Sequence, residues 1–288
     1  MYRFATCVFL LVMTLIMSLP ESGMAQSLGA DQFSGQTQDA ERKELLSTLT
    51  PLVPPDFFAP KAPPAAPGMT FGTPTAFGAG WRQGFVGLSG IAWLDNDVND
   101  NDVDGSMSFG AGFGDASETV GVELSVGIIS LTNNFADSGT VGAKIHKIIP
   151  DTDGLGVALG WDNVLNWGDA KKAEDTAYVV ASKKFILRPE ADHQYPLSVS
   201  LGVGTGTFRT INDIAADNND LNLFGSVGVQ VLPKLSVASS WTGSQLNVGF
   251  GVVPFDSPLA VTIGFNDVTE KKSLGAAFAM NVGYSFSF

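Results

Sequence analysis

Residues 246–266 read LNVGFGVVPFDSPLAVTIGFN, and this stretch decides the fold class. Large apolar residues occupy every second position on both sides of the proline-flanked turn at 254–258. Asn, Gly, Ala or Thr fill most of the positions between them. A period of two is the pattern of a β-strand, because successive side chains point to opposite faces. The stretch therefore predicts two strands joined by a short turn, each with one large apolar face and one face of small residues.

The same alternation recurs along the chain after about residue 80. It is clearest in residues 122–128, 155–161, 197–204 and 280–288. We count twelve such strands, beginning near residues 82, 105, 118, 139, 154, 175, 196, 221, 235, 246, 259 and 274. An even number lets both ends of a closed up-and-down barrel lie on one side. The pattern alone leaves ten or fourteen strands as alternatives, and it does not assign the facing of the first and sixth strands, which alternate poorly.

The composition favours a membrane barrel over a soluble β-sandwich. The outer face of a soluble sandwich meets water and carries Lys, Glu, Thr and Arg, whereas the second face here is Gly, Ser, Ala and Asn. Charged residues make up only 16% of the chain, against roughly 25% in an average soluble domain. We therefore predict an all-β fold, an antiparallel up-and-down transmembrane β-barrel whose large face contacts outer-membrane lipid. A secreted β-sandwich is the structural alternative.

The connections and the aromatic residues predict an orientation. If the first strand runs outward, the odd-numbered connections average about eight residues and the even-numbered ones about five, as outer loops and periplasmic turns do. Aromatic rings then gather in two belts at headgroup depth. The outer belt is Trp93, Trp161, Trp167, Trp241 and Phe265, and the periplasmic belt is Trp81, Phe85, Phe113, Phe185, Tyr195, Phe255, Phe286 and Phe288.

The last strand carries a family resemblance. Its large side chains alternate with small ones and are Met280, Val282, Tyr284, Phe286 and the C-terminal Phe288. This resembles the terminal strand signal of Gram-negative outer-membrane barrels, which implies that Tyr284, Phe286 and Phe288 are recognised by the barrel-assembly machinery. Residues 74–90, 224–232 and 240–267 further resemble an uncharacterised outer-membrane barrel family of cyanobacterial type. That resemblance implies a location in the bacterial outer membrane but no established activity.

The N-terminus has the features of a signal peptide. Arg3 precedes an almost wholly apolar run over residues 7–19, and residues 23–25 supply small side chains for cleavage. We expect residues 1–25 to be removed. That would take away Cys7, the only cysteine, and with it any disulfide or thiolate chemistry.

A proline-rich segment follows. Residues 51–74 hold 8 of the 15 prolines, a composition that favours extended geometry and does not build a core. We expect residues 26–80 to be a periplasmic lead or tether, with docking to a periplasmic partner as the alternative. Residues 81–288 are expected to form the barrel. Whether the lead plugs the lumen does not follow from composition.

An acidic loop at residues 95–105 is the most chemically suggestive segment. Asp100, Asp102 and Asp104, followed by Gly105, match the first half of a calcium-binding loop, in which alternate carboxylates surround a hard cation. The twelfth position is Ala111, where the EF-hand motif needs glutamate, so an EF-hand is excluded. A looser Ca²⁺ site is one interpretation and a solvated acidic loop is the other. No other cofactor is expected.

Four ionisable residues fall on the small-residue face of the third to fifth predicted strands: Glu123, Lys144, His146 and Asp162. Neighbouring strands would bring them together in the lumen. A structural salt-bridge network is the favoured role, and a selectivity constriction is the alternative. Because His146 and His193 are the only histidines, neither a Ser-His-acid arrangement nor a catalytic zinc site is indicated. We do not expect an enzyme.

Charge narrows the function further. The formal net charge of −13 argues against nucleic acid, whose phosphates need a basic surface. The predicted outer loops hold 13 acidic and 5 basic side chains, an extracellular mouth that would attract cations. The small-residue inner face leaves room for a lumen. The sequence thus predicts a passive channel for ions or small solutes; the alternative is a non-conducting barrel with a structural or polysaccharide-export role in the envelope.

Overall fold

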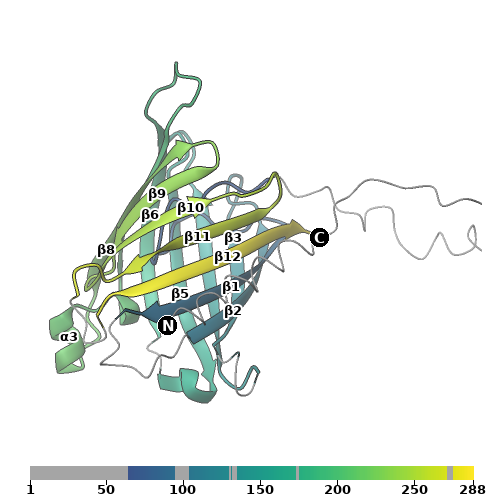
Figure 1. Cartoon of the computed structure of the whole chain (residues 1–288). Helices are drawn as coiled ribbons and strands as arrows, with labels where there is room; N and C mark the ends of the chain where they lie inside the picture. Colours follow the sequence, from purple (N-terminus) through teal and green to yellow (C-terminus); the bar gives the residue numbers. More distant parts are fainter. Residues whose placement is uncertain (1–63, 95–103, 130, 132–134, 173–174, 271–274) are drawn as a thin grey trace, which may run out of the picture. The chain divides into compact units, whose positions relative to one another are not determined.

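The computed structural model describes residues 64–94, 104–129, 131, 135–172, 175–270 and 275–288 (Figure 1). These residues form one sheet of antiparallel strands that closes on itself, with β1 beside β12. The strands are β1 (Gln83–Trp93), β2 (Asp104–Gly114), β3 (Gly121–Ile128), β4 (Gly139–Ile148), β5 (Gly156–Trp167), β6 (Thr176–Ile186), β7 (Pro196–Gly204), β8 (Asn222–Leu232), β9 (Leu235–Trp241), β10 (Leu246–Val252), β11 (Leu259–Asn266) and β12 (Ala277–Ser287). The predicted fold class and the count of twelve strands are confirmed, and the sandwich is excluded.

In the part of the chain that the structure describes, helical structure is confined to connections. The short helices η3 (Gly168–Lys172), η4 (Gly206–Phe208) and α3 (Ile211–Ala216) follow β5 and β7. Within the described ranges, no helix is long and apolar enough to cross a membrane.

The barrel closes through an uninterrupted ladder. β1 and β12 pair from Gln83 opposite Ser287 to Trp93 opposite Ala277. Beyond the ladder, the Phe288 N–H donates to the Arg82 carbonyl at 2.9 Å, and the Arg82 guanidinium donates to the Phe288 carbonyl. The rim at which β1 begins and β12 ends is called the terminal rim below, and the other is called the loop rim.

The two faces of the wall are inverted relative to a soluble protein. Leu159, Leu201 and Leu223 are 56%, 63% and 62% exposed on the outside, whereas the chain neighbours Ala158 and Ser200 are buried on the inside. Soluble proteins rarely expose an apolar surface that runs around the whole fold. An apolar outer band with small polar residues inside is the pattern of a barrel in contact with lipid.

One residue of the predicted periplasmic belt faces the other way. Phe85 points into the lumen, where its ring covers Gly110 on β2. β1 alternates poorly, so its pattern did not reveal this facing. Phe286 and Phe288 face outward, as expected.

Aromatic side chains fill one side of the interior. β6 turns Tyr178 and Val180 inward, which resolves the facing that its sequence left open. The rings of Phe208, from η4, and Phe224, from β8, stack at 3.9 Å, and Tyr178 meets both edge-on. The lumen is therefore packed with side chains beside β5–β8.

Candidate functional site

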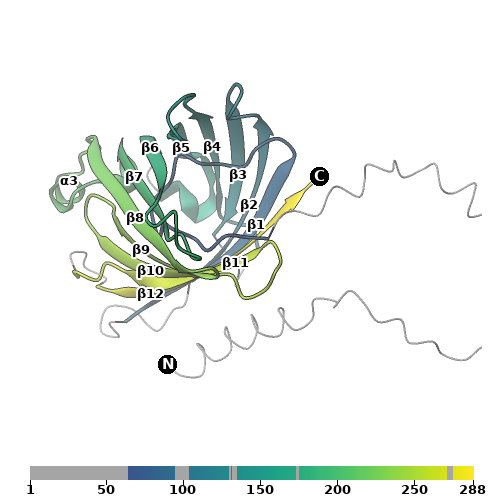
Figure 2. The ribbon, with the colours of Figure 1, turned by 90° about the horizontal axis from the view of Figure 1, so that it is seen from above.

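The lumen holds a segment of the chain itself. Residues 64–80, here called the luminal strap, run inside the ring of strands before β1 begins (Figure 2). This is part of the stretch whose proline content predicts a lead or tether. Residues 1–63, including the expected signal peptide and most of the proline-rich stretch, lie outside the described residues.

The first limb of the strap runs from the terminal rim toward the loop rim along β8–β11. The Ala65 N–H donates to the Ser257 carbonyl at 3.0 Å in the β10–β11 turn. Further up, the hydroxyls of Ser236 and Ser240, both on β9, donate to strap carbonyls at residues 68 and 71. The wall thus binds the strap backbone, and the strap needs no apolar core of its own.

The wall also leaves space for that backbone. A Cβ atom added at Gly228 on β8 would overlap the carbonyl of Met69. Here glycine is required because another backbone approaches closely. The glycines of the inner face are therefore not all bordered by an open lumen.

The strap turns near the loop rim and returns toward the terminal rim along β6, β5 and β4. The Thr70 hydroxyl donates to the Thr73 carbonyl at 3.1 Å across the turn, where Gly72 adopts φ +80°. On the return limb the Ala76 N–H donates to the Ser182 hydroxyl of β6 at 2.9 Å. That hydroxyl also lies 2.7 Å from the hydroxyl of Ser200 on β7.

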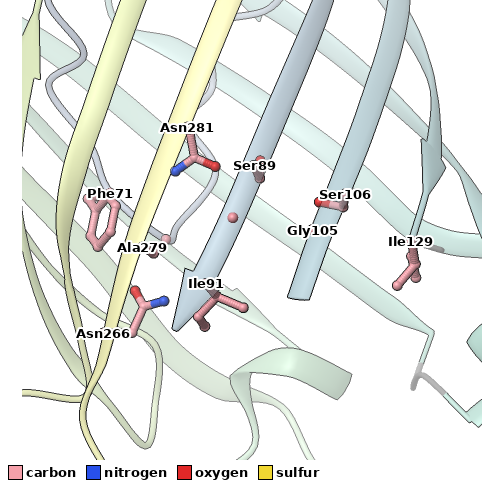
Figure 3. A pocket seen from close by; sticks show the side chains of 11 residues that line it. Phe71, Ser89, Ile91, Gly105, Ser106, Ile129, Asn266, Ala279 and Asn281 are labelled. Atoms are coloured by element: carbon pink, nitrogen blue, oxygen red, sulfur yellow. The ribbon is translucent and has the colours of Figure 1, made fainter. Parts of the chain in front are cut away.

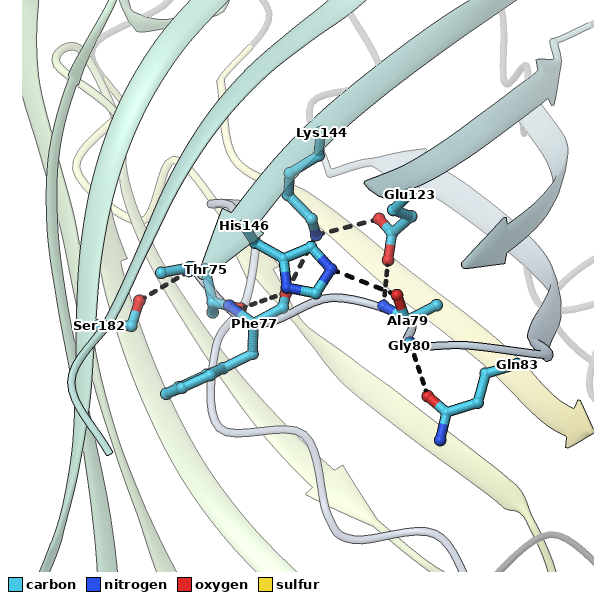
Figure 4. A network of polar contacts seen from close by, with 10 residues as sticks. Thr75, Phe77, Ala79, Gly80, Gln83, Glu123, Lys144, His146 and Ser182 are labelled. Atoms are coloured by element: carbon cyan, nitrogen blue, oxygen red, sulfur yellow. Dashed lines mark hydrogen bonds and ion pairs between the residues drawn. The ribbon is translucent and has the colours of Figure 1, made fainter. Parts of the chain in front are cut away.

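A charged cluster holds the end of the return limb (Figure 4). Glu123 on β3 and Lys144 on β4 form an ion pair of 3.0 Å, with side chains only 17% and 13% exposed. The other Glu123 oxygen accepts from the Ala79 N–H at 2.7 Å, and the Lys144 ammonium donates to the Phe77 carbonyl at 3.0 Å. His146 Nε2 lies 3.2 Å from the Ala79 carbonyl, so this nitrogen carries the proton.

The structure brings together three of the four ionisable residues expected in the lumen. Glu123 lies directly opposite Lys144 in the β3–β4 register, and His146 follows on the same face of β4. Asp162 does not join their hydrogen bonds to the strap. It begins a β-bulge in β5, across which Val141 pairs with Leu165 while Ala143 pairs with Trp161. Gly160 is the residue opposite Lys144, and the Asp162 carboxylate lies further along β5, beside Gly142.

Other candidate residues fall in different places. Asp100 and Asp102 of the calcium interpretation lie outside the described residues, and only the backbone of Asp104, the first residue of β2, is described. In the part of the chain that is described, no group of three or more His, Cys, Asp or Glu side chains is placed to hold a metal ion. His193 Nε2 binds the Gln230 carbonyl at 2.7 Å, far along the chain from the cluster.

Two cavities remain beside the strap, along the inner faces of β1, β2 and β12. One, of about 480 Å³, includes Phe71, Ile91 and Asn266 in its lining, and lies toward the loop rim. The other, of about 450 Å³, includes Ala65 and Phe85 and lies toward the terminal rim. Ser89 and Asn281 line both, so the two cavities meet at these residues.

Comparisons with known proteins find similarity of fold. Neither a protein-family model nor a curated protein sequence matches the chain. Among solved structures, the outer membrane protein Omp33 of Acinetobacter baumannii is 13% identical, with a TM-score of 0.41 over 74% of this chain and 100% of that one. The COG4313 outer membrane channel from Pseudomonas putida F1 is 11% identical, with a TM-score of 0.44 over 77% of this chain and 100% of that one. At these identities the likeness concerns the fold alone.

Proposed function

We propose that this protein is a passive outer-membrane channel for ions or small solutes, whose lumen is narrowed by the luminal strap. The observation that carries this proposal is the pair of adjoining cavities, which share Ser89 and Asn281 in their linings and lie inside a closed barrel with an apolar outer wall. A barrel built only as an anchor has no need of unfilled volume extending toward both rims. The proposal includes no enzymatic activity and no cofactor.

The partners follow from the same reasoning. The outer wall contacts outer-membrane lipid, and the barrel-assembly machinery recognises the outward-facing residues Tyr284, Phe286 and Phe288. With the terminal rim in the periplasm, the acidic loops form the extracellular mouth. Among described residues, Asp213, Asp217 and Asp220 in the β7–β8 connection contribute to it; Asp217 and Asp220 are exposed and Asp213 is half-buried. Such a mouth concentrates cations near the entrance.

Flux through proteoliposomes tests the channel. The purified full chain is reconstituted, and entry of sorbitol is followed by vesicle swelling while K⁺ current is recorded across planar bilayers. A channel admits at least one of the two probes faster than protein-free lipid does. If a folded, inserted barrel admits neither, the channel is refuted.

A non-conducting structural barrel in the envelope, with polysaccharide export as its setting, is the second candidate. The observation that favours it is the strap, which takes up luminal volume and is held by hydrogen bonds along both limbs. The absence of sorbitol and K⁺ flux would favour this candidate. Retention of a periplasmic partner that depends on residues 26–80 would then identify its role.

A further inference from the structure

The charged and uncharged parts of the inner wall are segregated. Glu123, Lys144 and His146 all lie on β3 and β4, and all three bind strap backbone atoms. The two cavities lie on the other side, against β1, β2 and β12. Figure 3 shows Ser89, Ile91, Ser106 and Asn281 around the cavity that lies toward the loop rim.

The cavity lining is mostly apolar, with a few hydrogen-bonding side chains and no formal charge. Its hydrogen-bonding side chains are hydroxyls and amides, among them Ser89, Ser106, Asn266 and Asn281, and its apolar ones include Phe71 and Phe85. Among the described lining residues there is no Asp, Glu, Lys, Arg or His. An ion that leaves water for such a passage finds no opposite charge, whereas a neutral polar solute finds donors and acceptors.

Two glycines face each other in the wall of the cavity toward the terminal rim. Gly87 on β1 pairs with Gly283 on β12, and both line this cavity. A Cβ atom added at Gly283 would have no other atom within 4 Å of it. The backbone at Gly283 therefore borders open space. Volumes of this size match those of small-molecule sites, about 300–1,000 Å³.

We propose that solutes cross along the β1–β2–β12 wall, past Ser89, Asn281 and Gly283, and that they are small uncharged molecules bearing hydroxyl or amide groups. The inference rests on the channel function proposed above and specifies its route and solute class. The strap forms the opposite side of this route, because Phe71 and Ala65 each line one of the cavities. The charged cluster fixes the strap and does not contact the solute.

The solute class is tested with three probes of similar size and different charge. The reconstituted full chain is assayed for entry of sorbitol, gluconate and N-methylglucamine by vesicle swelling. Sorbitol is expected to enter at least about fivefold faster than either ion. Equal rates for the three, or faster entry of an ion, would overturn the solute class while leaving the channel itself standing.

The route is tested with one residue pair on β12. Gly283→Phe adds a ring to the open space, and Met280→Phe places a ring at a lipid-facing position of the same strand that lines neither cavity. Gly283→Phe is expected to slow sorbitol entry at least about fivefold, and Met280→Phe to leave it unchanged. Unchanged entry through a folded Gly283→Phe barrel, verified by circular dichroism, would refute the route.

Cysteine modification tests the same route without an added ring. Ser89→Cys places a thiol on the shared lining of the cavities, and Ser236→Cys places one beneath the strap, at a position that is 0% exposed. An uncharged methanethiosulfonate reagent that carries a bulky polar group is expected to block flux in the first variant and not in the second. Block of both, or of neither, contradicts the proposed route. Absence of sorbitol flux through the unmodified full chain would instead refute the channel itself.

Discussion

The Glu123 carboxylate and the Lys144 ammonium lie 3.0 Å apart on facing positions of β3 and β4, and each also binds the backbone of the luminal strap. Removal of one partner from a largely buried pair leaves the other charge uncompensated. The pair therefore couples the barrel wall to residues 77–79. Loss of either charge should weaken the hold of the wall on the strap.

Lys144→Met tests that coupling. The substitution leaves Glu123 without its cation and the Phe77 carbonyl without its donor, and should destabilise the docked strap by about 3 kcal/mol. Amide hydrogen exchange at Ala76 and Ala79 should become faster, while exchange in β6–β8 stays unchanged. Lys147→Met is the matched control on the same strand, because the Lys147 ammonium binds the Thr119 carbonyl in the β2–β3 connection. Equal protection of Ala79 in both variants would show that the ion pair does not hold the strap.

Two glycine substitutions compare a wall position that the strap covers with one that borders open space. Gly228→Ala should displace the strap, because the added methyl group would overlap the Met69 carbonyl. Gly283→Ala adds a methyl group to open space and should leave the strap in place. We expect faster sorbitol entry with Gly228→Ala and no gain in entry with Gly283→Ala. Identical behaviour of the two variants would contradict the close approach of strap and wall.

The connection after β7 should loosen in acid. Asp213, at the third position of α3, accepts hydrogen bonds from the Thr210 hydroxyl at 2.6 Å and the Thr210 N–H at 3.1 Å. These bonds, with one from Asn222, hold the pKa of the Asp213 carboxyl below its usual value of 3.8. Because the folded-state pKa is lowered, the stabilisation is present above the unfolded pKa and is lost as pH falls through the folded one.

Hydrogen exchange of the Ile214 and Asp217 amides measures this effect. Their protection should persist at neutral pH and fall below about pH 3.8. Asp213→Asn should show weaker protection at neutral pH and little dependence on pH in this range. A wild-type profile in the Asp213→Asn variant would show that the carboxylate does not cap α3.

Phe288 is expected to act in assembly more than in transport. It faces outward at the terminal rim, and its backbone is tied to Arg82 at the start of β1. Deletion of Phe288 removes these contacts and the terminal ring, so the yield of membrane-inserted barrel should fall severalfold. Molecules that do insert should admit sorbitol at the wild-type rate. Normal insertion combined with altered flux would contradict this division of roles.

The fold could be predicted from local pattern because the membrane imposes a strict alternation on each strand. The twelve strands begin within a few residues of the positions expected from period two. The pattern failed for β1 and β6, where Phe85 and Tyr178 place large rings on the inner face. Both rings fill luminal volume against small neighbours on other strands, a tertiary match that alternation along one strand does not reveal.

The position of the strap could not be predicted from the local sequence pattern, for a different reason. Residues 64–80 have no alternation and no apolar face, since their backbone binds side chains from four strands that are distant in sequence, β3, β4, β6 and β9. The serines on β6 and β9 that hold them look like ordinary small inward residues. Glu123, Lys144 and His146 were identifiable by their charge, but their partners Phe77 and Ala79 were not, because a backbone carbonyl or amide has no sequence signature. The bulge that follows Trp161 in β5 was likewise not evident.

Removal of the strap shows whether the strap defines the passage. The full chain and a chain lacking residues 64–80 are reconstituted at equal density, and sorbitol, gluconate and N-methylglucamine entry are compared. We expect severalfold faster entry without the strap and a loss of the preference for sorbitol, because the whole lumen, including Glu123 and Lys144, becomes accessible. Equal rates and equal preference in two folded barrels would show that the strap does not define the passage.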